Sequence, residues 1–185
     1  MSNEKTNTMG TIQDIERLVI QLMNTRFEFK ANGENHVMSA RGIGYRFEWD
    51  GAKRRFGACH YGHKKITLSK PLCSINLDKI YGKIKDTILH EIAHAFSVEV
   101  YGRINGRGHD WRWRGIALAI GCDGKRCYDS SAVEKPKAKY TLSCPNDACD
   151  VQGSMHRKPK VNRSCGKCSG GKYNPKYEMI LTQNY

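Results

Sequence analysis

The chain has 185 residues and a formal net charge of +13, with 31 Lys and Arg against 18 Asp and Glu. This length accommodates one globular domain with a small appendage, and no stretch approaches the roughly 18 apolar residues of a membrane-spanning helix. The N-terminal "MSNEKTNTMG" is polar and unlike a signal peptide. We therefore expect a cytoplasmic protein that is neither secreted nor inserted in a membrane.

The positive charge is unevenly distributed along the chain. Residues 1–40 carry 4 basic and 5 acidic side chains, so the whole excess follows residue 40. Such a field attracts polyanions, of which nucleic acid is the leading candidate and an anionic membrane surface the next. The alternative is a basic surface that serves only solubility.

The first predicted elements are a leader, a helix and a group of strands. We expect residues 1–10 to be disordered and a helix to begin at Thr11, with Asp14 placed to complete a capping box. Apolar residues then recur at helical spacing, namely Ile12, Ile15, Leu18, Val19, Leu22 and Met23. From residue 42 to 68, alternating segments around an Asp-Gly turn predict a short antiparallel sheet or meander.

Two further helices and a cysteine-bearing unit are predicted after the strands. A helix from about residue 76 to 100 carries an apolar stripe of Ile84, Ile88, Ile92 and Phe96. The glycine-rich "YGRINGRG" at 101–108 is a loop, and another helix runs from about residue 109 to Gly121. The fold class is therefore α+β. Its parts are a main domain at 11–121, a linker at 122–139, a small unit at 140–176 and a tail at 177–185.

The stretch "TILHEIAHAF" places His90, Glu91 and His94 inside an apolar helix. Residues four apart on a helix project about 40° apart, so both imidazoles can reach one ion on the side away from the apolar stripe. This is the H-E-x-x-H pattern of zinc hydrolases. Neutral imidazoles leave the zinc cationic, so that a bound water acquires a pKa of roughly 7 and Glu91 can accept its proton. The alternative is a pair of core histidines with a surface glutamate.

A catalytic zinc needs a third protein ligand. Glu99 is rotated away on the same helix, whereas His109 follows the glycine-rich loop, where the chain can return to the metal. We favour His109 over its neighbour Asp110, because imidazole is a common third ligand.

Four cysteines in "CPNDAC" and "CGKC" predict a second, structural zinc site. Cys144 and Cys149 form one pair and Cys165 and Cys168 the other, with four thiolates and no open position. Such a zinc would stabilise a segment too small for an apolar core of its own. Cys122 and Cys127 form a competing pair, and we expect the remaining Cys59 and Cys73 to be buried apolar residues.

Taken together, "DTILHEIAHAF", "GRGHDWRWRGIALAIG", the preceding "ITLS" and the cysteine unit resemble the SprT-like metalloprotease family, which includes bacterial SprT and Spartan-like proteins. The resemblance implies a zincin-like metalloprotease domain followed by a zinc ribbon. It also implies His90, His94 and His109 as zinc ligands and Glu91 as general base. Trp111 or Trp113 would correspond to the family's tryptophan, as a packing residue. Eukaryotic members of the family are DNA-dependent and degrade proteins crosslinked to DNA, which implies a role in repair of DNA-protein crosslinks.

The basic residues that we expect to bind nucleic acid form two clusters. The loop cluster consists of Arg103, Arg107, Arg112 and Arg114, and the ribbon cluster consists of Arg157, Lys158, Lys160 and Arg163. Tyr140 and Tyr173 could offer stacking faces for bases. Tyr101 and Arg107 are candidates for stabilising an oxyanion.

The sequence thus predicts a monomeric, DNA-associated zinc metalloprotease with one catalytic and one structural zinc. It would bind DNA without sequence specificity and hydrolyse peptide bonds of proteins on that DNA. Two alternatives remain open. One is a catalytically silent DNA-binding or regulatory zinc protein, and the other is a zinc amidohydrolase acting on a non-protein substrate.

Overall fold

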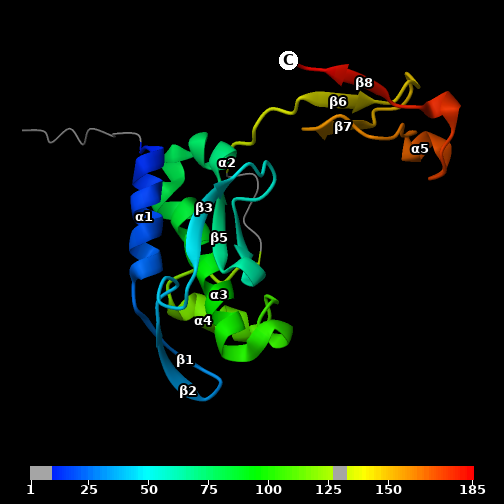
Figure 1. The fold of residues 1–185 in the computed structure, drawn as a ribbon. Helices are drawn as coiled ribbons and strands as arrows, with labels where there is room; N and C mark the ends of the chain where they lie inside the picture. Colours follow the sequence, from blue (N-terminus) through cyan, green and yellow to red (C-terminus); the bar gives the residue numbers. More distant parts are fainter. Residues whose placement is uncertain (1–9, 127–132) are drawn as a thin grey trace, which may run out of the picture. The chain divides into compact units, whose positions relative to one another are not determined.

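The computed structural model describes residues 10–126 and 133–185, so residues 1–9 of the predicted leader, Cys127 and part of the linker lie outside the described residues. The chain divides into two compact units, residues 1–135 and 136–185. Within the described residues, no helix is both long enough and apolar enough to span a membrane. Figure 1 shows the elements of both units.

Helix α1 (Ile12–Asn24) begins as predicted. The Thr11 hydroxyl accepts the backbone N–H of Asp14 at 3.1 Å, and the Asp14 carboxylate accepts that of Thr11 at 2.8 Å, which forms the capping box. The buried face of the helix consists of Ile15, Leu18, Val19, Leu22 and Met23.

A β-hairpin that the sequence analysis did not assign follows α1. Strand β1 (Phe27–Ala31) pairs antiparallel with β2 (Glu34–Met38). The connecting Asn32 and Gly33 have φ values of 51° and 82°, the left-handed conformation that Asn-Gly favours in a two-residue hairpin turn. Phe29 stacks on Phe96 with ring centroids 5.4 Å apart, which fixes the hairpin to the core.

The central sheet is mixed, so the predicted purely antiparallel arrangement is wrong for it. Strands β3 (Arg46–Asp50), β4 (Gly57–His60) and β5 (Lys65–Ser69) lie in the order β3-β5-β4. Strand β5 pairs antiparallel with β4 but parallel with β3. The connection at 51–56 is long enough to cross one strand, which leaves room for β5 in the middle.

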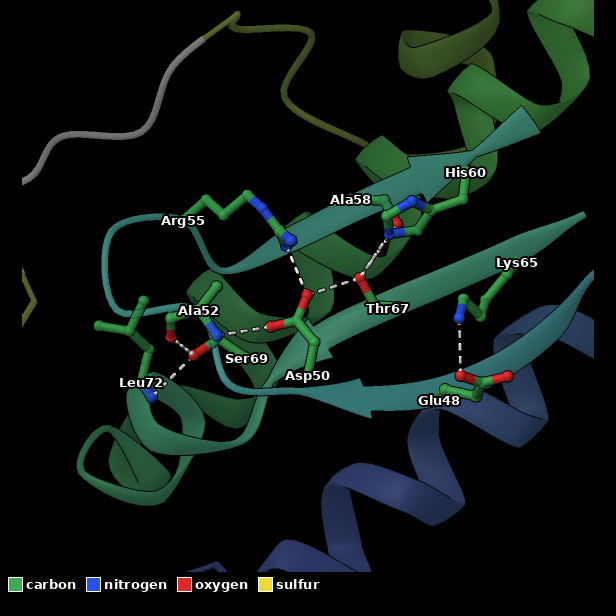
Figure 2. Close-up of polar contacts among 10 residues, drawn as sticks. All are labelled: Glu48, Asp50, Ala52, Arg55, Ala58, His60, Lys65, Thr67, Ser69 and Leu72. Atoms are coloured by element: carbon green, nitrogen blue, oxygen red, sulfur yellow. Dashed lines mark hydrogen bonds and ion pairs between the residues drawn. The ribbon is translucent and has the colours of Figure 1, made fainter. Parts of the chain in front are cut away.

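A network of hydrogen bonds ties this connection to the sheet (Figure 2). The Asp50 carboxylate accepts the Ala52 N–H at 2.9 Å, the Thr67 hydroxyl at 2.8 Å and Arg55 Nη1 at 2.6 Å. The Ser69 hydroxyl donates to Ala52 O at 2.5 Å and caps α2 (Lys70–Ser74). Because charge-assisted hydrogen bonds are the stronger kind, Asp50 holds the loop and the Arg55 side chain in place.

Helix α3 (Lys85–Asn105) is the centre of the first unit. It follows the short turns η2 (Leu77–Lys79) and η3 (Ile80–Ile84), and it contacts α1, β4, β5 and α4 (Trp111–Ala119; Figure 1). The predicted stripe of Ile84, Ile88, Ile92 and Phe96 is fully buried. Gly102, with φ 74°, breaks the helical conformation inside α3.

The second unit is a small antiparallel sheet with short helical turns. Strands β6 (Tyr140–Ser143), β7 (Gln152–Met155) and β8 (Ile180–Gln183) lie in the order β7-β6-β8, and the turns are α5 (Gly166–Ser169) and η5 (Pro175–Tyr177). Residues 180–183 were expected to trail from the unit, but they form its edge strand β8. The predicted fold class, an α+β domain followed by a small cysteine-bearing unit, is confirmed.

Candidate functional site

Three histidines converge where α3 meets the chain before α4. His90 and His94 lie one turn apart on α3, and His109 lies two residues before the start of α4. Nε2 of His109 is 3.0 Å from Nε2 of His90 and 3.0 Å from Nε2 of His94. The structure therefore brings together the three residues that were predicted as ligands.

Asp110, the alternative third ligand, does not take part in this cluster. Its carboxylate accepts the backbone N–H of Arg112 at 3.0 Å as the N-cap of α4, and it pairs with the Arg112 guanidinium at 2.7 Å. Its oxygens are thus engaged at the helix end.

The buried Trp113 packs against all three imidazoles. The centroid of its ring lies 4.6 Å from the ring centroids of His90 and His109 and 5.2 Å from the ring centroid of His94. Trp113 is 1% exposed, in agreement with a packing role, whereas Trp111 is 70% exposed and its ring is not buried in the core.

The protonation of the histidines suits metal binding. Burial lowers the pKa of His90 to about 4 and that of His94 to about 3, and it also lowers the pKa of His109. The rings are therefore neutral at pH 7, as imidazole ligands must be. Three neutral imidazole nitrogens that face one another form a donor set typical of a zinc site.

Glu91 lies in the same cavity, which has a volume of about 540 Å³, but its carboxylate is not part of the histidine cluster. The residue is 7% exposed, and burial raises its pKa to about 8, against the opposing effects of the Arg55 charge and the Cys59 backbone N–H. Gly57 lets β4 approach Glu91 on α3 closely, because a Cβ at position 57 would lie 3.1 Å from Glu91 Oε1. The carboxyl group is thus placed beside the cluster without joining it.

Several residues of the cavity wall were not singled out from the sequence. Arg55 lines it, held by Asp50 as Figure 2 shows, and so does Tyr61, whose hydroxyl is 3.3 Å from His94 Nδ1. Both follow sheet strands along the chain, and no local pattern marks them. Of the two oxyanion candidates, Arg107 lines the cavity. The Tyr101 hydroxyl instead accepts the backbone N–H of Asn32 at 2.9 Å, and Tyr101 is not in the cavity wall.

The second cluster consists of the four predicted cysteines. Cys144 Sγ lies 3.7 Å from Cys168 Sγ, and Cys149 Sγ lies 3.7 Å from Cys165 Sγ. No disulfide joins any of the described cysteines, and the four sulfurs are close enough to bind one ion. Backbone N–H donation from Cys168 lowers the pKa of Cys165 to about 7, which favours the thiolate that a metal requires.

Of the competing cysteine pair, Cys127 lies outside the described residues. Cys122 is buried in the first unit beside Asp86 and Asp123, and burial raises its pKa to about 12. The Asp86 carboxylate already accepts the backbone N–H of Asp123 at 2.8 Å. The group therefore offers one thiol and two carboxylates, of which the Asp86 carboxylate is already engaged.

The predicted nucleic-acid-binding residues fall in both units. In the loop cluster, Arg103 and Arg107 contact Tyr61, and the Arg112 guanidinium lies 5.1 Å from the Trp111 ring centroid. Arg114 is exposed on α4. The four residues of the ribbon cluster are exposed, and within the described part of the chain they form no ion pairs.

Comparison with known proteins agrees with this geometry. The germ cell nuclear acidic-1 protein of Caenorhabditis elegans is 26% identical over 117 residues, which cover 59% of this chain but only 20% of that protein. The chain thus spans about a fifth of the length of this relative. No solved structure gives a significant match. The model of the SprT-like family matches residues 20–132, which include α3, all three histidines and Glu91, and the chain belongs to that family.

Proposed function

We propose that this protein is a DNA-associated zinc metalloprotease that hydrolyses peptide bonds of proteins bound or crosslinked to DNA. The observation that carries the proposal is the meeting of three neutral imidazoles with a buried glutamate in one cavity. Membership of the SprT-like family supports the same activity.

A zinc ion held by His90, His94 and His109 would supply a Lewis acid that polarises a peptide carbonyl and acidifies water. The chain itself supplies the proton transfer. Glu91 accepts a proton from the attacking water and delivers it to the leaving amine. In the metal-free chain, burial raises the pKa of Glu91 to about 8, so the carboxyl group is largely protonated there. A neighbouring cation favours the ionised carboxylate that begins this step.

The proposed catalysis is tested by Glu91→Gln. We expect zinc content to remain and cleavage of a DNA-bound protein to fall by about 10²–10⁴-fold, the usual contribution of a general base. The matched control is Glu99→Gln on the same helix, where Glu99 forms only an exposed ion pair with Lys64 at 3.6 Å and activity should be unchanged.

Three outcomes would contradict the proposal. Cleavage that survives in Glu91→Gln would exclude Glu91 as the base. Zinc in both clusters without cleavage by the wild type would favour a silent DNA-binding protein. Attack on a small amide that does not depend on DNA would favour an amidohydrolase.

Two kinds of side chain, basic and aromatic, support the proposed binding to DNA. The basic clusters suit the phosphate backbone, and the exposed Trp111, flanked by Arg112 and by Tyr101 at a centroid distance of 6.2 Å, offers a cationic and aromatic surface for bases.

Neutralising the four residues of the ribbon cluster should weaken binding to a single-stranded oligonucleotide and make the binding less dependent on salt. Lys30→Gln, at an exposed lysine of β1, is the control, and an unchanged salt dependence would exclude the ribbon cluster.

A further inference from the structure

Tyr61 contacts the one cluster histidine that is almost fully buried. It lies in the turn η1 (Tyr61–His63) directly after β4, and its hydroxyl is 3.3 Å from Nδ1 of His94, which is 5% exposed. Nε2 of the same ring faces His109 at 3.0 Å. The two ring nitrogens of His94 therefore have different partners: Nε2 faces the histidine cluster and Nδ1 faces the Tyr61 phenol.

Tyr61 is itself held from two directions by the loop cluster. The Arg107 guanidinium lies 5.6 Å from the centroid of its ring, and Arg103 Nη2 donates to its backbone carbonyl at 3.4 Å. A tyrosine phenol, with an ordinary pKa of about 10, is neutral at pH 7. A neutral phenol oxygen can accept a hydrogen bond from an imidazole N–H.

We propose that Tyr61 is a positioning residue, which accepts the Nδ1–H of His94 and so holds the ring in the tautomer and orientation that direct Nε2 at the metal. This inference rests on the proposed zinc site. Without the phenol, the Nδ1–H of a buried ring would lose its acceptor, and the ring could rotate or change tautomer. Loss of such an outer partner typically weakens metal binding about 10–100-fold.

The test is Tyr61→Phe in the full chain, which removes only the hydroxyl oxygen. Cobalt is titrated against a competing chelator, because thiolate charge-transfer bands report the cysteine site and the weaker visible bands report the histidine site. We expect affinity at the histidine site to fall about 10–100-fold and affinity at the cysteine site to remain. Excess zinc should restore turnover with KM unchanged, which would not follow from a general loss of structure. Tyr81→Phe is the control, since Tyr81 is 80% exposed and outside the cavity wall.

A second measurement uses the wild type alone and does not depend on the folding of the variant. In long-range ¹H–¹⁵N spectra of the zinc-loaded protein, His94 should carry its proton on Nδ1, and that proton should exchange slowly. Equal metal affinity in Tyr61→Phe and wild type would overturn the role of Tyr61 and leave the zinc site standing. A proton on Nε2 would overturn that role and would also exclude Nε2 of His94 as the ligand atom. Binding of metal at the cysteines alone in the wild type would instead refute the proposed function, and Tyr61 with it.

Discussion

Burial moves the pKa values of the cavity residues in opposite directions. The pKa values of His90 and His94 fall to about 4 and about 3, whereas that of Glu91 rises to about 8. Each shift favours the neutral form of its group, because a buried site solvates charge poorly. His90, His94 and Glu91 are therefore mainly neutral at pH 7 in the metal-free chain, although charged side chains such as Arg55 and Arg107 line the same cavity.

These shifts predict how the stability of the metal-free chain depends on pH. Unfolding returns both imidazoles to a pKa near 6.5, so their contribution is complete above about pH 6.5 and is lost as the pH falls toward 4 and 3. Glu91 acts oppositely: its contribution is complete below about pH 4.5 and is lost as the pH rises through about 8. Between pH 6 and 4.5, the unfolded chain therefore binds about one proton more than the folded chain, so stability falls as the pH is lowered. Because His90 is partly exposed, we expect a loss of only about 1 kcal/mol per pH unit.

Two variants separate these contributions in urea unfolding of the metal-free protein at several pH values. Glu91→Gln removes the opposing group, so the loss of stability on acidification should become steeper. His94→Gln removes one of the two imidazoles, and the dependence should become nearly flat. Identical pH profiles for the wild type and both variants would contradict the assigned shifts.

At the scale of single residues, the sequence could predict only those contacts that depend on local geometry. The spacing of His90 and His94 on a helix follows from the helical repeat, and His109 follows from the loop that precedes it. Their grouping was therefore predictable, while their role as ligands stays a prediction. Tyr61 and His94 are 33 positions apart, and their contact depends on how β4 packs on α3. No pattern in a single sequence reports such a contact.

At the scale of elements, the end of α3 determines where His109 lies. Gly102 leaves the helical conformation with φ 74°, and the chain then folds back until Gly106 lies against the helix. A Cβ at Gly106 would lie 2.3 Å from the Ser97 carbonyl oxygen, a backbone atom that cannot move aside. The predicted loop at 101–108 is wrong for its first part, because α3 continues past the break at Gly102 to Asn105. The sequence also did not predict that Gly106 packs against the helix backbone.

We predict that Gly106→Ala displaces this loop and with it His109. The overlap with backbone should cost about 1–3 kcal/mol of stability and weaken zinc binding at the histidine site, as measured by urea unfolding and chelator competition. The control is Gly108→Ala in the same loop, where a Cβ would meet nothing closer than Asp110 N at 3.8 Å. Equal metal affinity in the two variants would show that the loop tolerates the methyl group.

The mixed order of the central sheet is a second feature that the sequence could not supply. The alternation of "YRFEW" and "HKKITLS" predicts strands, but it does not say which strand lies in the middle. Parallel pairing of β3 with β5 places the 51–56 connection across the sheet, where the Asp50 network holds Arg55 at the cavity. Pairing between distant strands thus positions a cavity residue that local patterns do not reveal.

At the scale of the whole molecule, the two units are stabilised by different means. The first has an extended apolar core around α3, whereas the buried apolar side chains described in the second are Leu142 and Cys165. So small a core is insufficient for folding, and the second unit therefore requires another stabilising interaction. Its four cysteines, with sulfurs 3.7 Å apart in two pairs, fit a zinc ion that supplies it.

We therefore predict that Cys165→Ser unfolds the second unit and leaves the first intact. Zinc at the cysteine cluster should be lost, and hydrogen exchange should become fast for the amides of β6, while those of α3 stay protected, because structural zinc binding and folding are one equilibrium. Cys73→Ala is the matched control: this buried cysteine belongs to the first unit, so its loss should lower the melting temperature of that unit and keep zinc in both clusters. Slow exchange in β6 of Cys165→Ser would mean that the sheet folds without its metal.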